Sequence, residues 1–290
     1  MTGVQTCALP ISAYRELVEL AYFEEDLALN VERFRSSEEF EETLKMLRTY
    51  TKDISAQKLL DLGAGNGVAS AAFALEGYDV TAVEPDPSAT IGAGAIRQLV
   101  DIYKLKNLQV IEAWGESLPC ASQSFDVVYI RQAVHHAAEL NNFIRESARL
   151  LKPGGVLMSA RDHVIYNEMD KQWFLETHPL HRFYGGENAF TEQEYRLAIE
   201  GAGLDIVLCL HHYESVINYF PEKRDEVEGK LYERKKWIEL AFLKKAPPPL
   251  NKISFLINLC YARIEKKLTP VFDERKIPGR MISFIAIKNA

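Results

Sequence analysis

The sequence predicts a doubly wound α/β sheet, and two observations support this prediction. A short apolar run, Leu59–Leu62, breaks into alternating glycines and continues into a run of good helix formers, Val68–Gly77. Apolar and β-branched runs then alternate with segments of helical periodicity along much of the chain. Such alternation is typical of sheets whose crossover helices cover both faces. We expect seven strands, six parallel and the last antiparallel, with helices in front of the sheet and a helical insertion near the end.

Length and composition are those of an ordinary soluble globular protein. The 290 residues suffice for one large α/β domain with an insertion or for two modest domains, and 47% are hydrophobic and 26% charged. The net charge of -7 argues against a nucleic-acid substrate held through its phosphates. No apolar stretch approaches the roughly 20 residues of a membrane span, so we expect a cytoplasmic protein without stable membrane insertion. Four widely separated cysteines show no metal-ligand spacing and are expected to be reduced thiols: Cys7, Cys120, Cys209 and Cys260.

The pattern of the glycine turn distinguishes between two classes of nucleotide ligand. A dinucleotide site has the pattern G-x-G-x-x-G, whose third glycine would fall on Val68, whereas the third glycine here is Gly67. Asp61 precedes the first glycine, and a carboxylate at that place disfavours a pyrophosphate. The same carboxylate suits a ligand with an ammonium and a sulfonium group. The turn therefore favours S-adenosylmethionine.

A second acid completes the pattern. Glu84 follows the β-branched run Asp79–Val83, about 20 residues after the turn, where a carboxylate can accept both ribose hydroxyls. With this acid the stretch resembles the class I S-adenosylmethionine-dependent methyltransferases, and the resemblance extends from Leu59 to about Leu210. It implies a Rossmann-like fold and a cofactor site that contains Asp61, Gly63, Ala64, Gly65, Asn66, Gly67, Glu84 and Pro85.

The loop after the third expected strand, Leu108–Glu112, resembles the adenine-contacting loop of the family, often written G-D-A-E-x-L-P. Trp114 departs from that pattern, because an Asp usually stands there and receives the adenine amino group. Either the indole stacks on the adenine or lines its pocket, or it is an ordinary core tryptophan. Gly115 takes the place of the small residue, and Glu116 is an adenine-side residue or an exposed loop acid. Arg131, after the fourth strand, is assigned to the cofactor site.

Histidines near the expected strand ends are the candidate catalytic residues. A base there could accept the proton of an attacking hydroxyl, and His titrates close enough to neutral pH to serve. Histidines at this place can also cap or pack the next helix, so a structural role is the alternative. The catalytic candidates are His135, His163 and His181. The segment 161–190 is expected to be a substrate lid, in which the substrate-binding candidates are Arg161, His163, His181 and Tyr184.

The N-terminal region has a helical pattern in two segments. The first contains Leu17 to Glu24, and the second begins at Ser36-Ser37, with Glu39 in the capping-box position. Arg33 and Arg35 precede the second helix and either reach the methionine carboxylate or lie on a solvated face.

Periodicity and helix breakers define the other elements. The breaker cluster Lys152–Gly155 ends one helix before the fifth strand, and Thr191 caps the helix that precedes the sixth. In order, we expect a helix over Ser88–Tyr103, a strand over Ser124–Ile130, a helix over Leu140–Leu151, a strand over Val156–Ala160, a helix through Ile199, and strands over Leu204–Leu210 and Met281–Ile287.

The chain divides into five segments. Residues 1–12 match the rest of the chain poorly and are expected to be a non-native or disordered leader, with the true start of the protein missing. The others are an N-terminal helical lid over 13–52, the S-adenosylmethionine-binding core over 53–210, a helical insertion over 211–280 and the final strand over 281–290. We expect the insertion to contain a charged helix over about 222–245 and an apolar helix over about 253–268. The apolar helix would pack on the sheet, form a homodimer or lie on a membrane surface.

The predicted function is S-adenosylmethionine-dependent methyl transfer to a small polar acceptor, with oxygen methylation of a sugar or related metabolite as the specific hypothesis. The protein would act mainly by orienting the acceptor about 3–3.5 Å from the methyl carbon in a dry pocket. One alternative is a non-catalytic S-adenosylmethionine-binding scaffold, for which the departure at Trp114 counts. The other is an NAD(P)-dependent oxidoreductase, against which Asp61 and the early third glycine count.

Overall fold

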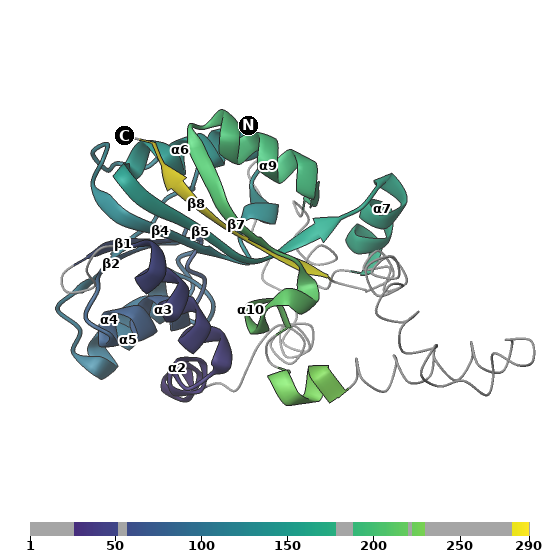
Figure 1. Cartoon of the computed structure of the whole chain (residues 1–290). Helices are drawn as coiled ribbons and strands as arrows, with labels where there is room; N and C mark the ends of the chain where they lie inside the picture. The colour runs from purple at the N-terminus through teal and green to yellow at the C-terminus, as the bar shows by residue number, and fades with distance from the viewer. Residues whose placement is uncertain (1–25, 52–56, 178–187, 220–221, 230–279, 290) are drawn as a thin grey trace, which may run out of the picture.

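The computed structural model describes residues 26–51, 57–177, 188–219, 222–229 and 280–289. A twisted central sheet carries helices on both faces (Figure 1). Its strands are β1 (Lys58–Leu62), β2 (Asp79–Val83), β3 (Leu108–Ile111), β4 (Phe125–Arg131), β5 (Leu151–Ile165), β6 (Phe190–Thr191), β7 (Leu204–Leu210) and β8 (Met281–Lys288). The helices are α2 (Leu27–Arg35), α3 (Glu38–Tyr50), α4 (Val68–Leu75), α5 (Ala93–Tyr103), α6 (Leu140–Leu150), α7 (Glu168–Thr177), α9 (Glu192–Gly201) and α10 (Val216–Tyr219), with short 3-10 turns η1 (Val134–His136) and η2 (His212–Glu214).

The strand order places the candidate site at the middle of the sheet. Neighbouring strands follow the order β3-β2-β1-β4-β5-β8-β7, and the two-residue strand β6 pairs with β5 off this path. β8 runs antiparallel to both β5 and β7, which confirms the predicted antiparallel last strand. The strand order reverses between β1 and β4, and open α/β sheets bind ligands beyond the carboxyl ends of the strands at such a point.

The two faces of the sheet have separate cores. Helices α6 and α9 cover one face, and α3, α4 and α5 cover the other (Figure 1). On the second face the rings of Phe73 and Tyr129 meet edge to face, with centroids 4.9 Å apart. Because β1 and β4 are buried on both sides, their backbones are held rigidly beneath the glycine turn.

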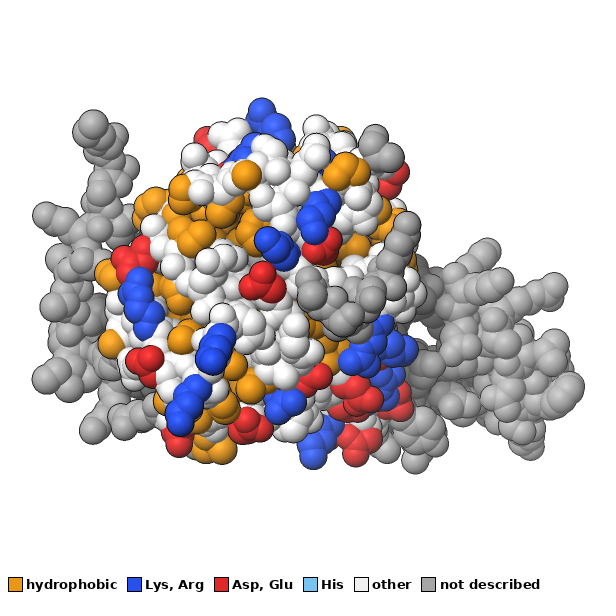
Figure 2. Space-filling view, turned by 90° about the vertical axis from the view of Figure 1, so that its left-hand side faces the viewer, with side chains coloured by type: hydrophobic (Ala, Val, Ile, Leu, Met, Phe, Trp, Pro, Cys, Tyr) orange, Lys and Arg blue, Asp and Glu red, His pale blue; other side chains and the backbone are white. Residues whose placement is uncertain are grey.

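Charged groups of both signs are scattered over one face of the molecule (Figure 2). On the face shown in Figure 2, Lys and Arg side chains lie interspersed with Asp and Glu side chains and with patches of hydrophobic atoms. Neither sign of charge dominates that face. Among the described residues, no helix is long and apolar enough to cross a membrane.

The N-terminal helices begin differently from the prediction. The N-cap of α3 is Ser37, whose hydroxyl oxygen accepts a hydrogen bond from the Phe40 amide at 3.2 Å. Ser36 instead ends α2, because its hydroxyl donates to the Glu32 carbonyl. The predicted capping box with Glu39 is therefore wrong, and that carboxylate reaches the sheet instead. The first predicted helical segment lies outside the described residues.

Helix α5 is shorter than predicted at its start. It begins at Ala93 and not at Ser88, because a turn precedes it. The Asp86 carboxylate accepts a hydrogen bond from the Ser88 amide at 2.7 Å. Gly92 lies so close that a Cβ built on it would be 2.2 Å from the Asp86 carbonyl oxygen. The helical periodicity of the sequence therefore included residues before Ala93 that form a turn in the structure.

Strand β5 is longer than the predicted strand Val156–Ala160. Its second half pairs with β8, so that Asp162 lies opposite Ile282 and His163 opposite Met281, after a register shift beyond Ser159. These side chains therefore lie on a strand, whereas the sequence suggested the start of a loop. The partner strand is more than a hundred residues away in sequence, and local patterns do not report such pairing.

The chain after Leu210 folds into short turns that the sequence did not predict. The side-chain amide of Asn218 in α10 donates to the carbonyls of Leu210 and His211, which fixes α10 against the end of β7. Residues 224–229 are helical, as expected for the start of the charged helix. The rest of that helix, the apolar helix over 253–268 and the leader over 1–12 lie outside the described residues.

Candidate cofactor and acceptor site

The glycine turn after β1 has a backbone that side chains would disrupt. Gly63, Gly65 and Gly67 have φ angles of 74°, 55° and 78°, in the left-handed region. A Cβ on Gly63 would lie 2.5 Å from the Ala133 Cβ, so the turn packs directly on the segment after β4. A Cβ on Gly65 would meet nothing within 4 Å. The turn is thus closed beneath and open above Gly65, at the N-terminus of α4, where backbone amides can face a ligand.

Glu84 links this turn to the loop after β2. One carboxylate oxygen accepts a hydrogen bond from the Gly65 amide at 2.8 Å, and the other accepts from the Asp86 amide at 3.0 Å. Burial raises the pKa of Glu84 to about 7, although these two hydrogen bonds lower it. Each oxygen has a second lone pair, so this carboxylate can also accept hydroxyl donors. Pro85 comes next in the same loop.

Asp61 lies beneath the turn and is only 1% exposed. Its carboxylate accepts a hydrogen bond of 2.5 Å from the Ser70 hydroxyl of α4. Burial raises the pKa of Asp61 to about 6, while the Ser70 hydrogen bond and the positive charge of Arg131 lower it. The carboxylate thus stands between the start of α4 and the end of β4.

The expected adenine loop has a tryptophan at its surface. Trp114 is 69% exposed, so its interpretation as a core residue is wrong. Gly115 packs on Phe143, where a Cβ would be 2.3 Å from the ring. The Glu116 carboxylate accepts a hydrogen bond from the Ala138 amide at 3.2 Å, which ties the loop to the segment after η1.

His135 and Asp162 form a buried pair at the carboxyl ends of β4 and β5. The Nδ1 atom of His135 lies 2.8 Å from an Asp162 oxygen, and the amides of Val134 and His135 donate to the same carboxylate. Burial alone would raise the pKa of Asp162, but the charge and hydrogen bonds of His135 lower it below its usual value. The carboxylate is therefore ionised at neutral pH and acts as an acceptor. Nδ1 is thus placed to donate to this carboxylate, and Nε2 lies on the opposite side of the ring.

The other candidate histidine of this region lies beside that pair. The ring of His163 meets the His135 ring edge to face at 4.8 Å and lies 4.7 Å from Phe174 of α7. The Tyr195 hydroxyl of α9 donates to the His163 carbonyl at 2.8 Å. The structure thus brings His135 and His163 together, as the sequence predicted for strand ends. His181 and Tyr184 lie outside the described residues.

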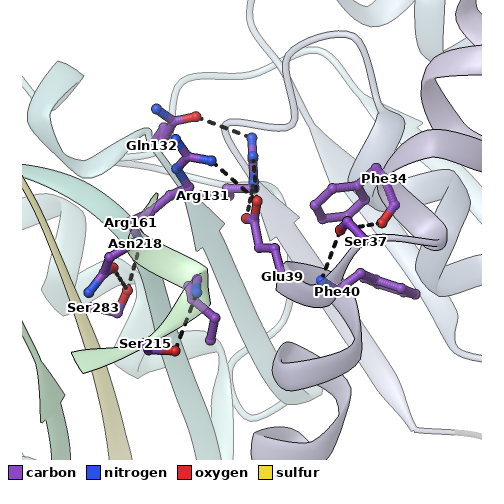
Figure 3. Close-up of polar contacts among 11 residues, drawn as sticks. Phe34, Ser37, Glu39, Phe40, Arg131, Gln132, Arg161, Ser215, Asn218 and Ser283 are labelled. Carbon is purple, nitrogen blue, oxygen red and sulfur yellow. Dashed lines mark hydrogen bonds and ion pairs between the residues drawn. The ribbon is translucent and has the colours of Figure 1, made fainter. Parts of the chain in front are cut away.

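Arg131 at the end of β4 and Arg161 within β5 converge on Glu39 of helix α3 (Figure 3). Arg131 donates to both oxygens of Glu39, from Nε at 2.7 Å and from Nη2 at 3.0 Å. Arg161 donates to Glu39 at 3.3 Å, and its own amide donates to the Ser283 hydroxyl at 2.8 Å. Gln132, which accepts from Arg131, and Arg161 have φ angles of 52° and 44°. Gln132 follows β4 directly, and Arg161 lies at the register shift within β5, so two non-glycine residues hold the left-handed strain that functional sites often contain.

Sequence reasoning missed Glu39 and Asp162 as site residues. Glu39 fits a capping pattern, and its arginine partner lies 92 residues away. Asp162 lies 27 residues from His135. Arg35, a candidate for the methionine carboxylate, instead forms an exposed ion pair with Glu76 at 2.8 Å.

The fold and the site together define the class of protein. A parallel sheet with an antiparallel final hairpin, a glycine turn after β1 and an acid after β2 are the features of a class I S-adenosylmethionine-dependent methyltransferase domain. Residues 60–159 match the family model described as "Methyltransferase domain". This part of the chain is therefore such a domain, and S-adenosylmethionine is the cofactor of its class.

Similar proteins carry methyltransferase names. The chain is 30% identical over 135 residues to the uncharacterized methyltransferase YcgJ of Bacillus subtilis, covering 43% of this chain and 49% of that protein. It is 32% identical over 103 residues to a ubiquinone biosynthesis O-methyltransferase of Pseudomonas putida, and this match covers 35% of this chain and 43% of that protein. The chain thus spans about half the length, or less, of these curated relatives.

Solved structures share the fold. The crystal structure of YcgJ superposes with a TM-score of 0.53 at 19% identity and covers 87% of this chain and 99% of that chain. The geranyl diphosphate C-methyltransferase of Streptomyces coelicolor, in complex with S-adenosyl-L-homocysteine, superposes with a TM-score of 0.56 at 11% identity. The match covers 87% of this chain and 79% of that chain. At these identities the likeness concerns the fold alone.

Proposed function

We propose that this chain transfers the methyl group of S-adenosylmethionine to an oxygen of a small polar acceptor, such as a sugar or a related metabolite. The observation that carries the proposal is the buried His135–Asp162 pair. It lies on the segment that packs against the glycine turn, because Ala133 contacts Gly63. A base is thus held next to the place where the cofactor would bind. A relative named as an O-methyltransferase supports an oxygen acceptor.

The residues present fit the cofactor. Glu84 would accept the ribose hydroxyls, because its carboxylate already joins the two loops that border the ribose position. The open turn at Gly65 and the buried Asp61 would hold the methionine part, with Arg131 nearby as a cation for its carboxylate. Trp114 would cover the adenine, since its exposed indole offers a large apolar face.

The chain's own residues would orient and deprotonate the acceptor. The bound cofactor supplies an electrophilic methyl group. Asp162 holds the His135 ring with Nε2 as the basic atom, and that atom would take the proton of the acceptor hydroxyl. The ionised carboxylate would then stabilise the imidazolium. Burial of the pair would exclude competing water.

Turnover with S-adenosylmethionine and a panel of polar alcohols tests this proposal. In His135→Gln we expect unchanged cofactor affinity and a turnover lowered about 10²- to 10⁴-fold, which is the usual contribution of a general base. His136→Gln is the matched control, because the neighbouring side chain is exposed. Cofactor binding without turnover on any acceptor would favour a scaffold. Tighter binding of a nicotinamide dinucleotide would revive the oxidoreductase alternative.

A further inference from the structure

A second cluster of chemically active side chains lies where β7 ends and α9 begins. Glu192 is the first residue of α9, Cys209 lies in β7, and His211 comes directly after β7. One ligand atom from each of these residues lies within 4.8 Å of the other two. α9 and β7 lie side by side in the structure (Figure 1). Among the described residues, this is the group of His, Cys and acid side chains whose atoms converge in the manner of a metal site.

The spacing of the donor atoms is close to that of tetrahedral zinc. The Cys209 sulfur lies 3.9 Å from one Glu192 oxygen, and the His211 Nε2 lies 3.0 Å from the other. Zinc bonds of about 2.0–2.3 Å at tetrahedral angles separate neighbouring donor atoms by roughly 3.3–3.7 Å. All three separations lie within 4.8 Å, so small side-chain rearrangements would convert the hydrogen-bonded cluster into a ligand set.

The cluster also has the outer partners that metal ligands require. The Nδ1 atom of His211 lies 3.0 Å from the Glu214 carboxylate, which would fix the ring with Nε2 toward the metal. The Arg196 guanidinium donates to the Glu192 carboxylate at 2.7 Å and lies over the Phe284 ring at 5.7 Å. Carboxylate–histidine pairs and hydrogen-bonded ligating carboxylates commonly surround the ligands of zinc sites.

We propose that Glu192, Cys209 and His211 bind one Zn²⁺ ion, with solvent as the fourth ligand. Sulfur, imidazole and carboxylate together suit zinc and not calcium or magnesium, which prefer oxygen ligands alone. The charges balance, because the ion, the thiolate, the two carboxylates of Glu192 and Glu214 and the Arg196 guanidinium sum to zero. Local sequence spacing does not reveal this site, since its ligands come from two elements that only the fold brings together.

The ion would fix one wall of the candidate acceptor site. Tyr195, on the first turn of α9, donates its hydroxyl to the His163 carbonyl and lies 3.4 Å from the Asp162 carboxylate. A metal at the start of α9 would therefore hold the helix whose first turn also supports the buried pair. The zinc site itself does not depend on the proposed methyl transfer.

Metal binding by the full chain, purified without a histidine tag, tests the proposal. We expect one equivalent of Zn²⁺ by competition with a chromophoric chelator, a higher melting temperature with zinc, and its reversal by chelation. Co²⁺ should give a thiolate charge-transfer band. Cys209→Ser should abolish that band, whereas the control Cys120→Ser, at the other free cysteine of the described residues, should keep it.

Further variants and two contradicting results decide whether the cluster binds zinc. Arg196→Gln leaves all three ligands in place and should weaken zinc binding about 10- to 100-fold, as loss of a partner of a ligating group does. A cobalt band that survives Cys209→Ser, or an absence of stoichiometric zinc binding by the folded wild-type chain, overturns the proposal. If circular dichroism shows that Cys209→Ser does not fold, Glu192→Gln provides the second test. We expect Glu192→Gln to bind zinc far more weakly than Arg196→Gln does.

Discussion

Arg131 donates two hydrogen bonds to Glu39, and this pair joins helix α3 to the end of β4. The Glu39 side chain is fully buried, and Arg161 adds a third contact to it. A buried carboxylate with two guanidinium partners is held in one position, so α3 has a fixed placement over the carboxyl edge of the sheet. Helix α3 is thus attached to the sheet through charge as well as through apolar packing.

Removal of this acid should destabilise the protein strongly. Glu39→Ala leaves the buried Arg161 guanidinium and the partly buried Arg131 guanidinium without their carboxylate, and breaking a buried ion pair in this way costs about 3–5 kcal/mol. Urea unfolding, followed by circular dichroism, measures the free energy. Glu41→Gln on the same helix is the control and should change it by less than about 0.5 kcal/mol, because Glu41 is exposed. Equal effects of the two changes would contradict a stabilising role for the pair.

The glycine turn should be intolerant of a methyl group at Gly67. A Cβ there would lie 2.7 Å from the Ile96 side chain, and the φ angle of 78° strains any other residue. We expect Gly67→Ala to cost at least about 2 kcal/mol, from backbone strain and overpacking together. Gly201→Ala, in the last turn of α9, is the control, since a Cβ there meets nothing within 4 Å. Gly201→Ala should be neutral or slightly stabilising. Thermal unfolding measures both variants, and a Gly67→Ala variant as stable as Gly201→Ala would contradict the prediction.

The turn and its acids were predictable from sequence, because each belongs to one continuous stretch whose spacing fixes a strand, a turn and a helix. Glu84 lies 19 residues from its partner Gly65, yet strand β2 next to β1 makes their approach a consequence of the fold. The Glu39–Arg131 and His135–Asp162 pairs were not predictable in this way. Each depends on how two distant elements dock, and in α3 a capping pattern offered a local explanation for the acid that was wrong.

The strand extents show the same limit. β5 continues past Ala160 because β8 pairs with it, and no local signal in residues 161–165 announces that partner. The sequence likewise did not decide whether Trp114 is buried or exposed, since a tryptophan in a loop is compatible with core and surface positions alike. Local patterns therefore predict the order of the elements, whereas the docking of distant segments decides which side chains meet.

Trp114 should matter for the cofactor and not for the fold. Its side chain is mostly exposed, so Trp114→Ala should change the free energy of unfolding by less than about 0.5 kcal/mol. If the indole covers the adenine, the loss of stacking should weaken S-adenosylhomocysteine binding by about 0.5–1.5 kcal/mol. Calorimetry measures this affinity, with Trp173→Ala as the control for a second exposed tryptophan outside that loop. Equal affinities of the wild type and Trp114→Ala would remove Trp114 from the site.

Cofactor affinity should increase with pH because of Glu84. Its pKa is raised from 4.5 to about 7, so the folded protein binds more protons than the unfolded chain between these values. Without ligand, this group therefore lowers stability as the pH rises through that window. Ribose hydroxyls donate more strongly to the ionised carboxylate than to the neutral acid, so cofactor binding favours release of the proton. Between pH 6 and pH 8 the ionised fraction rises from about one tenth to about nine tenths.

We therefore expect the affinity for S-adenosylhomocysteine to rise by up to about tenfold over this range, as measured by calorimetry. Asp61 has a pKa of about 6 and adds a smaller increase in the same direction. In Glu84→Gln the amide oxygen can still accept a hydroxyl but no longer titrates, so most of the pH dependence should disappear while measurable binding remains. A pH dependence that is the same in Glu84→Gln and the wild type would show that Glu84 does not hold the ribose as an ionised carboxylate.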